Sequence, residues 1–323
     1  MTSRNKVLNY LKLICVAVFG VLITTAQTLS PTAFPTPAGG PASLFTPYDA
    51  QGLRKVEYTL SLALENFSED VLDSKLMVRK MPYRIILPTD YKTNEETRYP
   101  VIYMLHGLTG NFANWTDKTK LTEYSAKHKY IVVTPEGANG WYADSVTDAN
   151  DKYESYIVKE LIPEIDKKFR TVADRDHRVI AGLSMGGYGA IKFGLKYPEM
   201  FRLVGSFSGA LGAASFTAKN AGLGIGGGID KIFGAEGSDT RKANDIFALI
   251  RDASPDKIKA MPFIYQSCGT EDFLIQNNRD FLALLNEKKV PHEYRELPGG
   301  HTWAFWDDQV REFLTVADRM MQK

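Results

Sequence analysis

The chain has 323 residues, of which 44% are hydrophobic and 24% are charged. This balance is close to the average of soluble globular proteins, and it excludes a disordered chain, a collagen-like chain and a protein with several membrane spans. With 39 basic and 38 acidic residues, the net charge is +1. So small a charge cannot hold nucleic acid or an anionic membrane surface, and we expect a globular protein with no nucleic-acid partner.

The N-terminus has the pattern of an export signal. Three basic residues precede an unbroken apolar run, 13–23, and small residues follow it as far as Ala26. The run is shorter than the roughly 20 residues that a membrane-spanning helix needs, so an uncleaved anchor is the weaker alternative. We expect a signal peptide at 1–26, a secreted or periplasmic protein, and no stable membrane insertion after cleavage. Removing three of the 39 basic residues and none of the 38 acidic ones leaves a net charge of −2.

The remaining chain is predicted to contain one linker and one domain. Residues 27–52 hold five prolines, which is typical of a linker or a loosely held arm. The folded domain is predicted at 53–323. Cys268 is the only cysteine left after signal removal, so no disulfide can form within the mature chain.

Short apolar runs alternate with helical patterns along the domain. An antiparallel start is predicted at 56–64 and 83–87, and six further strands at 101–105, 131–134, 179–183, 203–208, 263–267 and 293–297. Helices are expected at 118–128, 153–169, 186–197, 277–288 and 307–322. This order predicts an α/β sandwich with a mostly parallel central sheet, antiparallel N-terminal strands, helices on both faces and six buried strands.

A serine stands at one predicted strand-to-helix turn. The motif G-L-S-M-G-G, residues 182–187, follows the apolar run 179–181 and opens a helical segment. This placement is typical of a nucleophile elbow, in which glycines permit a sharp turn and the serine hydroxyl projects above the sheet edge. The start of the helix directs free amides and positive charge at the same position. Ser184 is therefore the candidate nucleophile, and the alternative is a plain tight turn.

A serine nucleophile needs a base and an orienting carboxylate, which follow it along the chain in the order acid, histidine. Only His292 and His301 lie downstream of the serine. His301 follows a Pro-Gly-Gly loop after the last predicted strand, whereas His292 begins that strand, so His301 is the candidate base. Asp272 is the candidate carboxylate in preference to Glu271, and its alternative role is a helix cap.

A second loop is predicted to supply amide donors. His106, Gly107 and Leu108 follow the strand predicted at 101–105, and a His-Gly loop in that position can turn a backbone amide toward the reacting carbonyl. The amides of Leu108 and Met185 are predicted to form an oxyanion hole. His106 precedes the serine, and we interpret its ring as a structural support of the loop.

At these residues the chain resembles the putative-esterase family, the α/β-hydrolase group that holds tributyrin, feruloyl and acetylxylan esterases, S-formylglutathione hydrolases and secreted mycolyltransferases. The resemblance covers roughly residues 54–315 and is strongest to the tributyrin-esterase branch, through motifs at 106–108, 111, 115, 139–142, 182–189, 207–211, 268–274 and 300–306. It implies an α/β-hydrolase fold, a triad of Ser184, Asp272 and His301, and oxyanion donors at Leu108 and Met185.

The resemblance also implies a serine carboxylesterase that forms an acyl-enzyme. Its substrates would be short-chain acyl or aromatic esters of the acetyl or feruloyl type, as small molecules or linked to polysaccharide, with no cofactor. An S-formylglutathione thioester is a weaker expectation, because Leu183 stands where that group usually has histidine. An acyltransferase and a non-catalytic binding protein on the same scaffold stay open, and the sequence makes no prediction about oligomeric state.

Other features have weaker interpretations. Glycines 222, 224 and 227 match a dinucleotide-binding spacing, but no strand leads into them, and no metal-ligand spacing occurs. Residues 210–259 are expected to form either a cover over the site or a surface loop. Trp141, Tyr142 and Trp303 follow predicted strands, so they are candidate substrate-binding residues, with core packing as the equal alternative.

Overall fold

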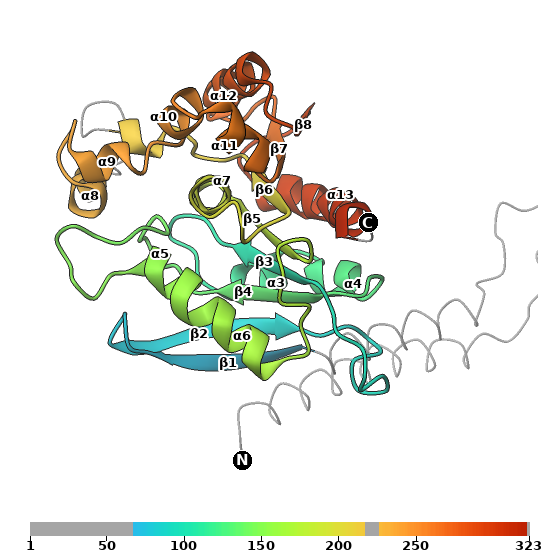
Figure 1. The fold of residues 1–323 in the computed structure, drawn as a ribbon. Helices are drawn as coiled ribbons and strands as arrows, with labels where there is room; N and C mark the ends of the chain where they lie inside the picture. Colours follow the sequence, from blue (N-terminus) through green and yellow to red (C-terminus); the bar gives the residue numbers. More distant parts are fainter. Residues whose placement is uncertain (1–66, 217–225, 322–323) are drawn as a thin grey trace, which may run out of the picture. The chain divides into compact units, whose positions relative to one another are not determined.

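The computed structural model describes residues 67–216 and 226–321 (Figure 1). The chain divides at residue 50, and all described residues belong to the second unit, Ala50–Lys323. The predicted signal peptide, the predicted linker and the strand expected at 56–64 lie outside the described residues.

Within the described residues, eight strands form one sheet in the order β1-β2-β4-β3-β5-β6-β7-β8. The pairs β1–β2 and β2–β4 are antiparallel, and every other neighbouring pair is parallel. The predicted mostly parallel sheet with antiparallel N-terminal strands is confirmed. The strands are β1 (Phe67–Ser74), β2 (Arg79–Ile86), β3 (Val101–Leu105), β4 (Ile131–Pro135), β5 (Arg178–Leu183), β6 (Leu203–Phe207), β7 (Phe263–Gly269) and β8 (His292–Leu297).

One strand prediction was wrong in its burial. Strands β3, β4, β5 and β6 are buried at every position, but β8 lies at the edge of the sheet and its residues are half-buried or exposed. A strand at the edge of a sheet pairs with a neighbour on one side only and need not be apolar throughout. The sequence of β8, H-E-Y-R-E-L, is accordingly a mixture of polar and apolar residues. Five buried parallel strands therefore stand at the centre, where six were predicted.

Helices and helical turns connect the strands. They are α3 (Asn114–Lys118), α4 (Leu121–Ser125), α5 (Tyr153–Tyr156), the π-helical η1 (Ile157–Leu161), α6 (Ile162–Lys168), α7 (Met185–Lys196), the 3-10 turn η2 (Ala213–Ser215), α8 (Gly226–Phe233), α9 (Asp239–Lys242), α10 (Ile246–Arg251), α11 (Pro255–Ala260), α12 (Ile275–Lys288) and α13 (Trp303–Met321). Elements α5, η1 and α6 follow one another without a break and correspond to the helix predicted at 153–169.

The single helix predicted at 118–128 was wrong, because two short helices, α3 and α4, occupy this region. Thr119 separates them with an extended backbone, φ −135° and ψ 171°. Its hydroxyl donates to the carbonyl of Trp115 and accepts from the amide of Leu121. A threonine side chain that binds nearby backbone in this way competes with helix continuation.

Apolar side chains cover both faces of the sheet, as predicted. Alternate strand residues point to opposite faces, so Tyr103 packs in the cluster that includes α7, whereas Met104 packs in the cluster that includes α4 and α13. The two clusters correspond to the helical layers on either side of the sheet in Figure 1. Burial on both faces is the reason that the central strands read as continuous apolar runs.

The segment between β6 and β7 is largely helical where the structure describes it, and it carries α8 to α11 (Figure 1). Ile229, Phe233, Ile246 and Ile250 from this segment are fully buried in the main core. Arg241 is buried as well and donates to the carbonyls of residues 214, 216 and 234. The glycines at 222 and 224 lie outside the described residues.

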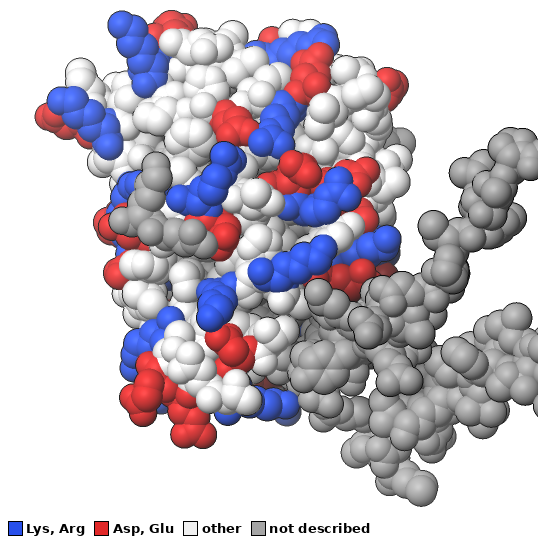
Figure 2. Space-filling model, turned by 90° about the vertical axis from the view of Figure 1, so that its right-hand side faces the viewer, with Lys and Arg blue, Asp and Glu red and all other residues white. Residues whose placement is uncertain are grey.

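The described surface carries mixed charge. On the face shown in Figure 2, lysines and arginines are interspersed with aspartates and glutamates. Across residues 67–216 and 226–321, no helix combines the length and the apolar character needed to cross a bilayer. The same residues contain no group of three or more His, Cys, Asp or Glu arranged to hold a metal ion.

Candidate active site

The parallel strands end at one edge of the sheet, where polar residues gather. Parallel strands present their carboxyl ends on the same side, and loops at this edge are where α/β proteins bind ligands. The residues placed here by the loops after β3, β4, β5, β6, β7 and β8 are His106, Glu136, Ser184, Ser208, Asp272 and His301.

Ser184 occupies the turn between β5 and α7 with φ 52° and ψ −115°. A non-glycine residue rarely adopts a positive φ, and such strain at a sharp turn is typical of a nucleophile elbow. The neighbouring glycines are required by contact. A Cβ on Gly182 would lie 2.5 Å from the carbonyl carbon of Gly186, and one on Gly186 would lie 2.4 Å from the carbonyl oxygen of Leu105.

Two backbone amides near Ser184 are available as donors. Met185 is the first residue of α7, so its N–H has no partner within the helix. Leu108 lines the cavity beside Ser184, and in the described part of the chain its N–H donates to no acceptor. These are the two amides that the sequence predicted for an oxyanion hole.

His301 and Asp272 are in direct contact. The Nδ1 atom of His301 lies 2.9 Å from one carboxylate oxygen of Asp272 and 3.1 Å from the other. Asp272 is 2% exposed and also accepts the N–H of Leu274 at 2.9 Å. Burial would raise the pKa of Asp272, but the hydrogen bonds from His301 and Leu274 outweigh it and hold the pKa below its ordinary value. The carboxylate is therefore charged and keeps the ring proton on Nδ1.

Aromatic rings hold the imidazole of His301 on two sides. Trp306 meets it edge-on, with ring centres 4.9 Å apart, and donates its indole N–H to the hydroxyl of Ser208 at 3.2 Å. Phe273 lies 4.6 Å from the imidazole centre although its side chain is 74% exposed. Sequence reasoning did not assign a role to Phe273, whose signal was its position next to Asp272.

Ser184 and His301 line one cavity of about 230 Å³, together with Leu108 and Trp303. In the described residues no hydrogen bond joins the serine hydroxyl to the imidazole. Such bonds are often long without substrate and shorten when it binds. The other ring that was weighed as a base, His292, lies at the start of β8 and has its Nδ1 2.7 Å from the carbonyl of Val290.

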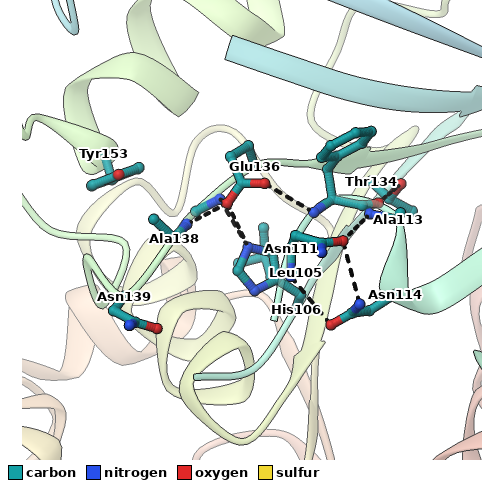
Figure 3. Close-up of polar contacts among 12 residues, drawn as sticks. Leu105, His106, Asn111, Ala113, Asn114, Thr134, Glu136, Ala138, Asn139 and Tyr153 are labelled. Carbon is teal, nitrogen blue, oxygen red and sulfur yellow. Dashed lines mark hydrogen bonds and ion pairs between the residues drawn. The ribbon is translucent and has the colours of Figure 1, made fainter. Parts of the chain in front are cut away.

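His106 uses both ring nitrogens to hold the loop that carries Leu108. Its Nε2 accepts the N–H of Gly137 at 2.9 Å, and its Nδ1 lies 2.8 Å from the carbonyl of Gly107. Figure 3 shows Glu136 beside this ring, with its carboxylate 3.4 Å from Nε2. The same carboxylate accepts the amides of residues 112, 137 and 138. These contacts leave His106 without a nitrogen for base chemistry.

Asn139 adds a further support that sequence reasoning missed. Its side-chain oxygen accepts the N–H of Thr109 at 2.7 Å, next to the candidate oxyanion donor. Thr109 has φ 62°, so the hydrogen bond holds a backbone conformation that is otherwise unfavourable. The sequence feature that could have indicated Asn139 is its position: residues 136–139 follow a predicted strand and lie at the sheet edge where the other site residues gather.

Two of the three candidate substrate-binding aromatics are buried in the core. Trp303 lines the cavity beside Ser184, but Trp141 and Tyr142 are 3% and 0% exposed and do not line it. Trp141 packs edge-on against Tyr188. The hydroxyl of Tyr142 donates to the carbonyl of His106 at 3.0 Å. Tyr142 therefore supports the loop that carries Leu108, whereas Trp141 packs in the core against α7.

A buried ion pair fixes the backbone of Tyr142. Lys192 on α7 is fully buried, and its ammonium donates to the Tyr142 carbonyl at 2.6 Å and pairs with Glu154 at 2.8 Å. Burial alone would raise the pKa of Glu154, but Lys192 and Lys196 outweigh it and lower the pKa to about 2. The pair thus ties α5, α7 and this loop together.

Comparison with known proteins identifies the family of this chain. A family model described as "Putative esterase" matches residues 74–315. The chain belongs to that family. An acetyl esterase of Caldicellulosiruptor saccharolyticus is 31% identical over 251 residues, which cover 73% of this chain and 92% of the relative.

Solved structures give the same result. A ferulic acid esterase superposes with a TM-score of 0.69 and 28% identity, covering 79% of this chain and 98% of its own. The fluorophosphonate-binding serine hydrolase F of Staphylococcus aureus has a TM-score of 0.69 and 27% identity, with 78% and 97% covered. The esterase described here is thus a carboxylic ester hydrolase with the α/β-hydrolase fold.

Proposed function

We propose that this esterase cleaves its substrate through a triad of Ser184, His301 and Asp272. The observation that carries the proposal is the contact between His301 and the buried Asp272, at the same cavity as the strained Ser184 turn. A carboxylate on Nδ1 leaves Nε2 of the histidine free to accept a proton.

In the proposed mechanism, Ser184 attacks the ester carbonyl while His301 takes the hydroxyl proton. The carbonyl oxygen becomes an oxyanion, which the amides of Leu108 and Met185 stabilise. His301 then gives its proton to the leaving alcohol, and an acyl-enzyme remains on Ser184. Water attacks this intermediate with His301 again as base, and the acid is released. The charged Asp272 stabilises the imidazolium at both stages.

We propose short acyl or aromatic acyl groups, of the acetyl or feruloyl type, as the substrate class. The support is the small cavity, about 230 Å³, with Trp303 and Trp306 in its wall. The names of relatives also support it, since one is an acetyl esterase and another a ferulic acid esterase. The alcohol can be a small molecule or part of a polysaccharide.

The decisive experiment compares wild type with Ser184→Ala on para-nitrophenyl esters from acetate to octanoate and on a feruloyl ester. We expect turnover of short chains by wild type and almost complete loss in Ser184→Ala. A fluorophosphonate probe should label wild type and a Ser254→Ala control, which changes an exposed helix cap, but not Ser184→Ala. Equal activity or equal labelling of Ser184→Ala would contradict the proposal.

We also propose that the protein is exported and loses residues 1–26. The basic residues and the short apolar run in the sequence support this. Expression in a bacterial host with separate recovery of periplasm, medium and cytoplasm tests it, with N-terminal sequencing of the product. A product found in the cytoplasm with an intact N-terminus would contradict it.

A further inference from the structure

The cavity beside Ser184 contains one side chain that the proposed mechanism does not use, Lys118. The cavity is lined by residues 107–110, 114, 118, 183, 184, 301, 303 and 306. Among these described residues Lys118 is the only lysine or arginine, and none is an aspartate or glutamate. These described residues therefore give the cavity wall a positive charge and no carboxylate.

No carboxylate neutralises Lys118 within the described residues. Its sequence neighbour Asp117 pairs with Arg84 instead, and no ion pair of Lys118 occurs across 67–216 and 226–321. A surface lysine commonly forms an ion pair with a nearby acid or is hydrated. Here the ammonium stands at the rim of a cavity that also contains the nucleophile and the base.

An aromatic platform places this ammonium. The Nζ atom of Lys118 lies 5.2 Å from the ring centre of Trp303, a distance at which the π face attracts a cation. Trp303 is itself held edge-on by Trp115 and by Trp306, with ring centres 5.8 Å and 5.1 Å away. Because Trp115 is 1% exposed, the platform is anchored in the core, and the exposed Lys118 lies over it.

A second donor faces the same cavity. Thr109 lines it, and within the described chain the hydroxyl of Thr109 makes no hydrogen bond, since its contact with Asn139 uses the backbone N–H. An ammonium and a hydroxyl without protein acceptors form a donor set for an anion. A carboxylate is an anion whose oxygens can accept from both kinds of donor.

We propose that Lys118 forms an anion subsite and that this esterase prefers esters carrying a carboxylate, on either the acyl or the alcohol part. The inference rests on the proposed function of the same cavity and names its substrate class more closely. Exposed ion pairs typically contribute little, so the expected preference is modest, about fivefold in kcat/KM.

The test uses two pairs of esters that differ in one charge. The first pair is para-acetoxybenzoate and its methyl ester, which vary the alcohol part. The second is the mono-para-nitrophenyl ester of adipic acid and its methyl ester, which vary the acyl part. Lys118→Met keeps the aliphatic stem on Trp303 and removes the charge. Lys120→Met is the matched control, because Lys120 is also exposed but does not line the cavity.

We expect Lys118→Met to lower kcat/KM about fivefold for the charged member of at least one pair, while the neutral members and Lys120→Met are unchanged. Salt should weaken the wild-type preference, since at about 1 M the screening length falls to about 3 Å. An equal effect on charged and neutral esters in both pairs would overturn the inference, because it would show a structural role only.

A binding measurement separates this inference from the proposed function. Ser184→Ala with and without Lys118→Met is titrated with para-acetoxybenzoate, and binding is followed by tryptophan fluorescence. Weaker binding on loss of Lys118 supports the subsite without turnover, and equal binding overturns it. If wild type hydrolyses neither neutral ester, the proposed function fails while the titration still decides the subsite.

Discussion

Replacement of Asp272 by asparagine tests how the protein orients the imidazole of His301, the proposed base. One carboxylate oxygen of Asp272 accepts the N–H of Leu274 at 2.9 Å, and the other lies 2.9 Å from Nδ1 of His301. The Leu274 amide needs an acceptor, so an asparagine must turn its oxygen toward Leu274. Its NH₂ group then occupies the position of the second oxygen and points at Nδ1 of His301.

The altered contact forces the wrong tautomer. The NH₂ group lies at the nearer position, 2.9 Å from Nδ1, and the amide oxygen keeps the 3.1 Å position. With a donor at the shorter distance, Nδ1 becomes the acceptor and the ring proton moves to Nε2, which can then no longer take the proton of Ser184. A change of this kind in a serine-histidine-aspartate triad lowers kcat about ten-thousand-fold. We expect a loss of that order here, with the fold preserved, because asparagine has nearly the volume of aspartate.

The assay is the initial rate on para-nitrophenyl acetate, with circular dichroism and a thermal melt to verify folding. Glu271→Gln is the matched control. Glu271 is exposed and accepts from the amide of Gly299 with one oxygen and from the hydroxyl of Thr270 with the other. Glutamine keeps an oxygen for the Gly299 amide, and its NH₂ group can donate to the Thr270 hydroxyl. This variant should stay within about twofold of wild type. A folded Asp272→Asn enzyme with near-wild-type turnover would refute the reasoning.

Three further predictions concern the supports of the site. Asn139→Ala should lower kcat about tenfold with little change in KM, because it frees the backbone beside a proposed oxyanion donor. Asn139→Asp should restore activity because aspartate keeps the acceptor. Unchanged kinetics in Asn139→Ala would contradict this prediction. Gly186→Ala should give inactive or insoluble protein, because its Cβ would lie 2.4 Å from a backbone atom. In Gly228→Ala the new Cβ has no atom within 4 Å, so this control should raise the free energy of unfolding by about 0.5 kcal/mol. Thermal melts and activity assays compare the two variants. The pKa of Glu154 is lowered from 4.5 to about 2, so its charged form stabilises the fold above about pH 4.5 and that stability is lost as the pH falls toward 2. In urea unfolding, the free energy of unfolding of wild type should fall by about 3 kcal/mol between pH 4.5 and 2 because of this group. Glu154→Gln should lack this fall.

Several parts of the fold follow from local sequence. The β-branched runs of β3, β4, β5 and β6 predicted buried strands because a strand covered on both faces must be apolar at every position. The elbow at 182–187 could also be predicted, because its glycine-serine motif follows an apolar run. The structure shows why these glycines are needed, since a Cβ on Gly182 or Gly186 would clash with backbone atoms. Chain order then restricted the candidate base and acid to a few residues, and the structure brings His301 and Asp272 into contact.

Other parts depended on tertiary packing. The sequence left Trp141 and Tyr142 open between pocket and core, and packing against α7 decided for the core. Asn139 supports Thr109 from 30 residues away, and Lys118 reaches Trp303 across a far longer stretch of chain. Periodicity reports which face of one segment is buried, but it carries no information on which distant segment covers that face. The sequence therefore determined the strands and the candidate reacting groups, whereas the pocket wall and the loop supports were decided by contacts that exist only once the sheet has formed.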